Sequence, residues 1–438
     1  MLPARNSVFA TDEIYKSPKG TLVLRATFAG KLTIHQLKNL IRTKLVNRRM
    51  SDGELKYPEL QQSVEKFLGF YFYKQDKTFD LNHHVTWIGK PQEVFNSSDG
   101  AEIHEILIHR AFQSEKSPWE FVGMNLEGNP AETTIYFRIH HCLADGYSIA
   151  QIIISDLGER PMGFIKRVTK NASPDRTRLS ILDLWRVPHE QVKQRYFSKD
   201  INALHNSGIN LSKRYHSLVT DRIELDLVKG IKNNENCSFT AVILACVTAS
   251  FRKHFLRVGG EIPDCIHTIC PLPIPNHGDR LGNEWTFCFV RLPVGATSCL
   301  EMLISIQKSL RSVKESSVPK VNWALIPFVG WLTHGLIETF SRNVFSTVIT
   351  SIFAGTQETV YFEGIPMTGK IFAGGLLHGD QGICVTVCSN LDKFQICLMI
   401  DRALMDRAAA KEILEEVHFQ MLALYSRTSK KHNQEALK

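Results

Sequence analysis

The clearest periodic signals in the first third of the chain are strands followed by helices. Residues 133–140 alternate apolar with polar side chains, which is typical of a strand. Like them, residues 21–28 are rich in β-branched and aromatic side chains, so both stretches are predicted to be strands. Residues 34–45 and 148–157 instead place their apolar side chains at helical spacing, and Thr33 is a suitable N-cap for the first of these helices. This part of the chain therefore predicts an α/β fold.

Further elements follow from shorter patterns. In the first half, we expect strands at 70–73 and 79–85 and a helix at 102–112. A second α/β pattern begins after residue 215. Its predicted helices are 238–255, 299–313 and 405–425, and its predicted strands are 265–272, 285–292, 382–387 and 394–400, the last two forming a hairpin. Residues 426–438 are polar and are expected to fray.

The span 160–215 separates the two patterns. It contains Pro161, Pro174 and Pro188 and shows no long periodicity, so we interpret it as a connection with short helices. The chain is thus expected to form an N-terminal lobe at 1–159, a basic connection at 160–215 and a C-terminal lobe at 216–438. Two such lobes predict a cleft or tunnel between them.

Residues 321–340 are the most apolar region of the chain. Pro327, Gly330, His334 and Glu338 interrupt it, so it falls short of a continuous membrane span. Its pattern fits a helix pair that lies at a membrane interface or lines a substrate site. An ordinary core helix is the alternative.

Composition and charge narrow the class of protein. With 438 residues, 43% hydrophobic and 22% charged, the chain is globular and long enough for two domains. Residues 160–214 hold twelve Lys or Arg against four Asp or Glu, a balance of +8 that equals the net charge of the whole chain. This span could meet anionic lipid, a phosphate-bearing cofactor or nucleic acid, or could be a solvated linker. Nucleic acid is the least supported, because no binding module accompanies the charge.

The cysteines and the N-terminal residues predict the redox state of the compartment in which the protein lies. Ten cysteines are scattered without CxxC pairs, and the first ten residues lack the apolar core of a signal peptide, so we expect reduced thiols facing the cytosol. No metal site is expected, because His83-His84 and Cys384 with Cys388 lack the partners that a four-ligand site needs.

The strongest candidate for chemistry is the stretch His140-His141-Cys142-Leu143-Ala144-Asp145-Gly146, at the junction of a predicted strand and a predicted helix. Adjacent residues at a strand end point to opposite sides, so one histidine can enter a given cleft. A neutral imidazole can take a proton from a hydroxyl or thiol as it attacks a carbonyl. Asp145 could orient the strand end through a hydrogen bond or through an ion pair with a distant arginine. Gly146 could allow the backbone to turn sharply. The alternative is a satisfied histidine beside a common Asp-Gly turn.

These residues resemble a known family. The stretch from His140 to Gly146 matches the HHxxxDG signature of the chloramphenicol-acetyltransferase-like superfamily, and the order of landmarks resembles the wax ester synthase/diacylglycerol acyltransferase family. The other landmarks are Phe79-Asp80, His84-Val85, Ser117-Pro118-Trp119-Glu120, Leu281-Gly282-Asn283, Phe362-Glu363-Gly364, Ser389, Asp401 and Asp406. The chain departs from the family pattern at Thr240-Ala241 and in the segment from Ser351 to Thr356, both in the second lobe.

The resemblance implies a fold and a reaction. The fold would be two chloramphenicol-acetyltransferase-like lobes, each a mixed sheet with flanking helices, with the active site in a tunnel between them. A fatty acyl-CoA would be the co-substrate, with no further cofactor, and a long-chain alcohol or a diacylglycerol the acceptor. His141, next to His140, would be the general base, and Asp145 and Gly146 would hold the loop. Such a protein would sit peripherally on the cytoplasmic face of a membrane, at the endoplasmic reticulum or a lipid droplet.

Two further residues complete the predicted site. The reaction would pass through an oxyanion, for which Asn283 is our candidate hydrogen-bond donor, although Asn is also a common turn residue. Trp119 is our candidate for lining an acyl tunnel, with a buried core tryptophan as the alternative, and we place it among the substrate-binding residues.

Other functions remain open. Gly146-Tyr147-Ser148-Ile149-Ala150 is one residue short of a GxSxG elbow, so Ser148 could be the nucleophile of a hydrolase with a later base such as His378. A lipid-binding carrier could retain the motif as structure. A sibling enzyme could take its acyl group from a carrier protein or pass it to an amine.

Overall fold

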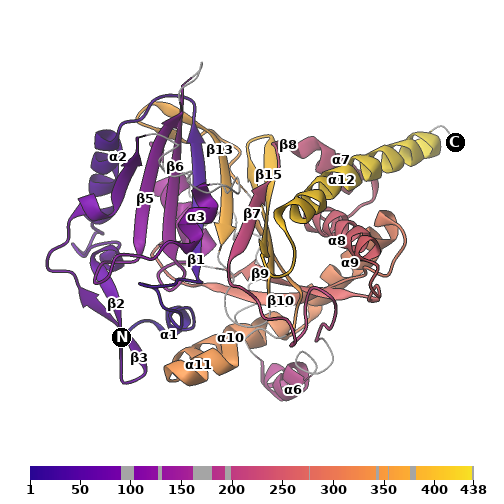
Figure 1. Cartoon of the computed structure of the whole chain (residues 1–438), viewed down its shortest axis with the longest axis horizontal. Helices are drawn as coiled ribbons and strands as arrows, with labels where there is room; N and C mark the ends of the chain where they lie inside the picture. The colour runs from indigo at the N-terminus through magenta and orange to yellow at the C-terminus, as the bar shows by residue number, and fades with distance from the viewer. Residues whose placement is uncertain are drawn as a thin grey trace.

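The computed structural model describes residues 1–89, 103–126, 131–160, 180–192, 199–275, 277–341, 345–353, 355–374 and 381–436. They form two lobes, each built on a β-sheet with flanking helices (Figure 1). The first sheet has the order β12-β13-β1-β6-β5-β4, and only its β4–β5 pair is parallel. Its strands are β1 (Thr21–Phe28), β4 (Val85–Ile88), β5 (Trp119–Leu126), β6 (Glu132–His140), β12 (Tyr361–Phe362) and β13 (Ile365–Gly374).

The second sheet has the order β10-β9-β11-β14-β15-β7, with β8 paired to β15. Here β11 runs parallel to both β9 and β14, so this sheet is also mixed. Its strands are β7 (Tyr215–Val219), β8 (Ile223–Glu224), β9 (Ile266–Pro273), β10 (Trp285–Leu292), β11 (Val348–Phe353), β14 (Ile383–Asn390) and β15 (Lys393–Asp401). A separate hairpin pairs β2 (Gln62–Phe67) with β3 (Phe70–Gln75).

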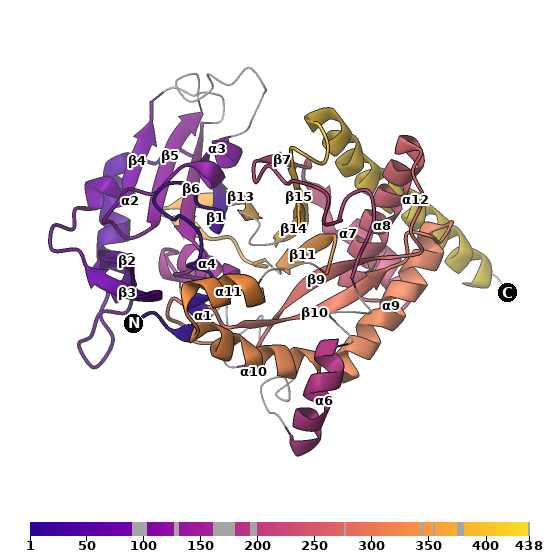
Figure 2. The same cartoon turned by 60° about the horizontal axis from the view of Figure 1, so that its bottom comes forward.

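Helices cover the outer faces of the sheets and close the lower side of the molecule (Figures 1 and 2). Those of the first half are α1 (Ala4–Ser7), α2 (Ile34–Ile41), α3 (Ile103–His109) and α4 (Gly146–Gln151). Later helices are α6 (Ile181–Val192), α7 (Leu225–Asn234), α8 (Phe239–Val258), α9 (Cys299–Glu315), α10 (Val318–Gly330), α11 (His334–Ser341) and α12 (Arg407–Ala436).

Strand β13 joins the two lobes. It pairs with β1 in the first sheet although it lies in the C-terminal half of the chain. On its other side it contacts the second sheet, where Lys370 Nζ donates to Asn390 Oδ1 at 3.2 Å and the N–H of Gly374 lies 3.2 Å from Met399 Sδ. The expected ranges 1–159 and 216–438 therefore do not coincide with the two sheets, because the chain returns to the first sheet through β12 and β13.

Helix α8 is the central core helix of the second lobe. Thirteen of its residues are buried, and Ser238 caps its N-terminus by accepting the N–H of Ala241. By length and composition, α8 is the one helix in the described ranges that could cross a membrane. Its burial against the sheet and its neighbouring helices accounts for its apolar composition.

The predicted elements were mostly confirmed, with two errors. The strands at 21–28 and 285–292 have the expected bounds, and Thr33 forms a capping box with Gln36 at the start of α2. The strand at 79–85 was wrong: Asp80 caps a 3₁₀ turn at Leu81–His83, and the strand begins only at β4. The fraying of 426–438 was wrong as far as α12 is described, because the helix continues to Ala436.

Candidate active site

Strand β6 ends at the histidine pair and is held there by β1. His140, the last residue of β6, pairs with Thr21 of β1. The side chains of His140 and His141 point to opposite sides, as expected for successive residues of an extended chain. His140 contacts Asp12, whereas His141 stacks on Phe9. Asp12 and Phe9 come from the irregular N-terminal segment, in which the sequence offered no periodic signal.

His140 forms a buried ion pair with Asp12. Its Nε2 lies 2.9 Å from Oδ1 and 3.1 Å from Oδ2 of the carboxylate. Burial opposes the charged imidazole, but the charge and hydrogen bond of Asp12 prevail and raise the pKa of His140 to about 10. Burial likewise opposes the carboxylate, but His140 and the N–H groups of Lys19 and Gly20 lower the pKa of Asp12 to about 2. Because His140 keeps its proton, it is suited to holding the motif and not to accepting a proton.

His141 has the opposite character. Its ring stacks on Phe9 at a centroid distance of 4.0 Å and an interplanar angle of 5°, and the ring of Trp285 lies 6.4 Å away. Burial lowers the pKa of His141 to about 4, although the charge of Asp145 acts to raise it. Within the described ranges, nothing hydrogen-bonds its buried Nδ1. His141 is therefore neutral near pH 7 and can act as a base.

Asp145 is the N-cap of α4. Its Oδ1 accepts the N–H of Ser148 at 2.8 Å. Its Oδ2 accepts the N–H of Glu284 at 2.8 Å and lies 3.0 Å from Nε2 of His277. We expected a distant arginine as the ionic partner, and the structure places His277 there instead. Asp145 thus ties the motif to the loop that precedes β10.

His277 is charged because of this contact. Burial disfavours its cation, but the charge of Asp145 and their hydrogen bond raise the pKa of His277 to about 9. The same contact, against the effect of burial, lowers the pKa of Asp145. The other ring nitrogen of His277 donates to the carbonyl of Gly278 at 2.7 Å. The sequence analysis missed His277 because it lies 132 residues from Asp145, in a loop without a periodic pattern.

Gly146 is required by space and not by backbone conformation. It is the first residue of α4, and its φ is not among the positive values. A Cβ atom at this position would lie 2.4 Å from Cζ of Phe353. Our prediction of a sharp turn at Gly146 is therefore corrected: the ring of Phe353 lies where a side chain would be. Phe353 belongs to the segment in which the sequence departs from the family pattern.

Asn283 holds the backbone of His141. Its Nδ2 donates to the His141 carbonyl at 2.7 Å and to Oδ1 of Asn6 at 3.2 Å. Its Oδ1 is buried without a hydrogen-bond partner in the described part of the chain. Because both amide protons are engaged, neither is left for an oxyanion. The contacts favour a positioning role for Asn283 over the oxyanion role that we predicted.

Trp119 packs as a core residue. It is 1% exposed, its indole N–H donates to the carbonyl of Leu60 at 2.8 Å, and its ring stacks on His84 at 4.3 Å. These contacts account for the residue without a ligand. Its place in an acyl tunnel stays a prediction.

Ser148 is not arranged as a nucleophile. Its hydroxyl donates to the carbonyl of Gly282 at 3.2 Å and lies 3.5 Å from the carbonyl of Arg280. None of the histidines in the described ranges accepts its proton, and His378 lies outside those ranges. The geometry therefore gives no support to the hydrolase alternative.

Sequence comparison finds relatives of this chain among acyltransferases. The WS/DGAT C-terminal domain matches residues 281–421, a range that begins at Leu281, next to the loop around Asp145. The chain is also similar to the O-acyltransferase WSD of Acinetobacter baylyi, with 23% identity over 386 residues, which cover 77% of this chain and 80% of that protein. These matches support the wax ester synthase/diacylglycerol acyltransferase family for this chain. The protein is an acyltransferase.

Solved structures show that the fold of this chain is a known one. A wax ester synthase/diacylglycerol acyltransferase from Marinobacter aquaeolei VT8 superposes with a TM-score of 0.65 at 15% identity, covering 97% of this chain and 98% of that one. The starter condensation domain of rhizomide synthetase, solved in complex with C8-CoA, superposes with a TM-score of 0.62 at 10% identity and covers 97% and 94% of the two chains. The two-lobed chloramphenicol-acetyltransferase-like fold that we expected is confirmed.

Proposed function

We propose that the protein transfers a fatty acyl group from an acyl-CoA thioester to the hydroxyl of a long-chain alcohol or a diacylglycerol. The observation that carries this proposal is His141, a neutral imidazole with an unpartnered buried Nδ1, held at the end of β6. Family membership supports the acyl-CoA donor and the hydroxyl acceptor. The protein needs no further cofactor in this proposal, because a thioester carbonyl is already activated.

The reaction proceeds by direct transfer. His141 takes the proton of the acceptor hydroxyl while its oxygen attacks the thioester carbonyl carbon. The tetrahedral oxyanion then collapses, the carbon–sulfur bond breaks, and the imidazolium returns the proton to the CoA thiolate. Ester and free CoA leave, and no covalent enzyme intermediate forms.

The other motif residues position His141. Asn283 fixes its backbone carbonyl, and the Asp145–His277 ion pair fixes the start of α4. The buried pair of His140 with Asp12 holds the opposite side of the strand end. The substrates would meet His141 in a passage between the lobes, and the enzyme would work on the cytoplasmic side of a membrane or lipid droplet.

Release of CoA tests the proposal. Purified protein is given palmitoyl-CoA with hexadecanol, with diacylglycerol or with neither, and free thiol is measured. We expect release only with an acceptor, and the acceptor that supports release names the product. His141→Ala should abolish it, because no other described residue replaces the base.

The matched control is His35→Ala, which removes an exposed histidine in α2. It should release CoA as the wild type does, and circular dichroism should show that both variants are folded. Release without acceptor would point to a hydrolase instead. Acceptor-dependent release that survives His141→Ala would remove His141 from the mechanism.

A further inference from the structure

The chain segment that precedes β1 supplies part of the proposed active site. Three of its side chains contact the histidine motif or the residue that holds it, namely Asn6, Phe9 and Asp12. Asn6 accepts a hydrogen bond from Asn283 at 3.2 Å, and Phe9 covers one face of the His141 ring. The site is therefore built by the motif together with residues 6–12, which lie far from it in sequence.

This segment is also anchored at points away from the motif. The Arg5 guanidinium lies over the ring of Trp323 in α10, 3.1 Å from its centroid, and Nη2 of Arg5 donates to the Trp323 carbonyl at 2.8 Å. The N–H of Leu2 donates to the carbonyl of Tyr71 in β3 at 2.9 Å. Figure 2 shows α1, which carries Arg5, beside α10. The segment is therefore held in place by α10 and β3 as well as by the motif.

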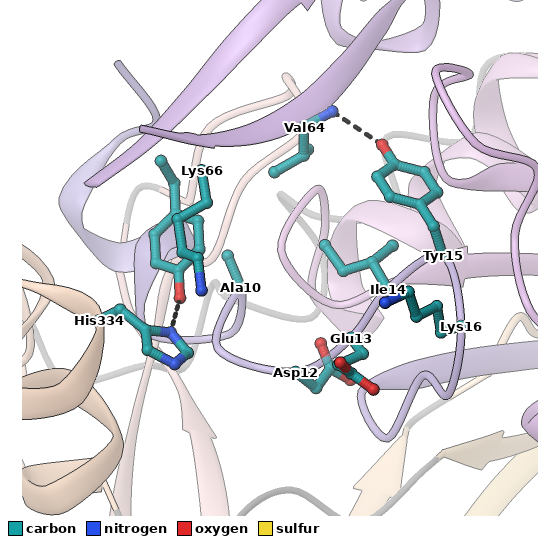
Figure 3. A pocket seen from close by; sticks show the side chains of 10 residues that line it. Ala10, Asp12, Glu13, Ile14, Tyr15, Lys16, Val64, Lys66 and His334 are labelled. Carbon is teal, nitrogen blue, oxygen red and sulfur yellow. Dashed lines mark hydrogen bonds between the residues drawn. The ribbon is translucent and has the colours of Figure 1, made fainter. Parts of the chain in front are cut away.

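A pocket lies on the other side of the segment. It has a volume of about 230 Å³, and Ala10 and Asp12 line it from the segment, with His334 of α11 across from them (Figure 3). Phe9 precedes Ala10 in the chain, and its side chain is 3% exposed. One chain segment therefore separates the pocket from the ring of His141.

The contact between Phe9 and His141 fixes the plane of the imidazole. The two rings lie face to face, with 4.0 Å between their centroids and 5° between their planes. Rotation about the bond that joins an imidazole ring to its Cβ atom has only a broad preference, so packing must set the plane of the ring. Because the rings are close to van der Waals contact, turning the imidazole out of this plane would press its edge into Phe9. Trp285 packs on Phe9 in turn, at a centroid distance of 5.8 Å and a tilt of 43°.

Two buried polar atoms make the site sensitive to water. Within the described part of the chain, Nδ1 of His141 and Oδ1 of Asn283 are buried without a hydrogen-bond partner. Water enters a protein interior where it finds space and about two to four polar partners, and these two atoms could serve as such partners. Phe9 instead places an apolar ring against the imidazole, on the segment that borders the pocket. Removing this ring would open space in which water could hydrate His141.

We propose that Phe9 is a positioning residue for the base. Its ring holds the imidazole of His141 in one plane and keeps water away from it, so the imidazole meets the acceptor hydroxyl in one orientation. Phe9 acts through His141 and takes no part in making or breaking bonds. The inference rests on the proposed function, which makes His141 the base. It gives the segment before β1 a role that the histidine motif alone does not predict.

Two substitutions separate the two parts of this role. Phe9→Leu keeps an apolar side chain but removes the flat face, so kcat for CoA release should fall by about tenfold or more, while KM and the acid limb of the pH–rate profile stay unchanged. Phe9→Ala also leaves a cavity that water can enter, so the acid limb should in addition move from near pH 4 toward the usual histidine pKa of 6.5. A residue that only fills space would move neither kcat at constant KM nor the acid limb.

The matched control is Phe251→Leu. Phe251 is a fully buried ring of α8 in the second lobe, so its substitution costs stability without changing a contact of His141. This variant should keep the wild-type kcat and acid limb, and circular dichroism should show that the variants are folded. If Phe9→Ala does not fold, the comparison of Phe9→Leu with the control decides. Wild-type kcat in Phe9→Leu, an unmoved acid limb in folded Phe9→Ala, or an equal loss of kcat in Phe251→Leu would each overturn the proposal.

Titration of His141 by NMR separates this proposal from the proposed function. The imidazole resonances of the full chain are followed from pH 4 to 8, and the resonance of His141 is the one that His141→Ala removes. We expect its pKa to rise by about one unit or more in Phe9→Ala and to stay unchanged in Phe251→Leu. If the pKa rises but no acceptor supports CoA release, the effect of Phe9 on His141 stands and the proposed function fails. If acceptor-dependent release is found but the pKa does not move, the proposed function stands and the role of Phe9 fails.

Discussion

Two adjacent histidines in this motif have opposite protonation states because their surroundings differ. His140 faces a buried carboxylate, and its pKa rises to about 10, whereas His141 faces aromatic rings, and burial lowers its pKa to about 4. One residue therefore holds the structure as a cation while the next is free to accept a proton. The contrast depends on Asp12 and Phe9, which the motif itself does not contain.

The lowered pKa of His141 predicts the acid limb of the pH–rate profile. A base works only while neutral, so activity should persist below the usual histidine pKa of 6.5 and fall near pH 4. The measurement is kcat/KM for CoA release at pH values where the protein remains folded. An acid limb near pH 6.5 would show that His141 is solvated or that another group is the base.

The His277–Asp145 pair predicts how stability depends on pH. The pKa of His277 is about 9 in the folded state, above the usual histidine value of 6.5. The pair therefore stabilises the fold fully below pH 6.5, and the contribution of about 3 kcal/mol disappears as the pH rises to 9. His277→Asn should lose this part of the pH dependence.

Urea unfolding at pH 6 to 9 provides the test, with His35→Asn as the control. His140 contributes with the same sign up to about pH 10, so the difference between wild type and variant isolates His277. Parallel curves for the two proteins would mean that His277 is neutral in the folded state.

Among the elements, strand β11 contacts helix α4 through the ring of Phe353. The side chain of Phe353, at the end of β11, lies against Gly146 and 5.6 Å from the ring of Tyr147. It also stacks on Phe372 of β13 at 5.0 Å. The contact therefore connects both sheets to the histidine motif, at a position where the chain departs from the family pattern.

This contact predicts a compensating pair of substitutions. Gly146→Ala should destabilise the protein by about 1–3 kcal/mol, because the new methyl group overlaps the Phe353 ring. Adding Phe353→Ala should recover part of that loss, giving a favourable coupling free energy in a double-mutant cycle. Urea unfolding of the four proteins measures it. Additive effects would show that Gly146 is needed for a reason other than the ring.

Periodicity was sufficient for most elements, and it failed where contacts distant in sequence decide the structure. Local patterns were sufficient to predict the strands at 21–28 and 133–140 and the helix after Thr33. The histidine motif was correctly placed at the junction of a strand and a helix. No local signal marks Asp12 or His277 as ionic partners, since each becomes significant only after the chain has folded. The pairing of β13 with β1 could not be predicted for the same reason, because it joins residues more than 300 positions apart.

The long helix α12 shows a second reason why a prediction from the sequence failed. Its polar end at 426–436 has little apolar periodicity, so we predicted that it frays. In the structure the preceding turns pack on the second lobe and the helix continues, because extending a formed helix is easier than starting one.

The whole molecule depends on contacts between the two lobes. Glu105 of α3 accepts hydrogen bonds from Arg402 at 2.9 Å, from Arg407 at 2.7 Å and from the N–H of Ser217 at 3.1 Å. Around it lies a buried cluster to which both lobes contribute, including Val23 from the first sheet and Met399 from the second, within a larger group. This buried carboxylate, within an apolar interface, is one of the contacts that hold the two lobes together.

Glu105→Gln should weaken this interface. The amide keeps the shape but loses the charge that two arginines share, so we expect a loss of about 1–3 kcal/mol and a broader or divided calorimetric transition. The control is Glu412→Gln, which removes an exposed contact with Arg257 inside the second lobe and should change stability by less than about 0.5 kcal/mol. A single, unshifted transition in Glu105→Gln would mean that the lobes stay coupled without this charge.

The pairing of β13 with β1 also has a consequence for synthesis on the ribosome. Strand β6 is complete at His140, but the neighbour on the other side of β1 ends only at Gly374, 234 residues later. At ordinary rates of translation, the edge of β1 waits roughly 10 to 50 s for its partner. During that time it presents open hydrogen-bonding groups to other nascent chains. Cutting the gene between the lobes would make this exposure permanent, so the two halves are expected to be insoluble when made separately and to recover when made together.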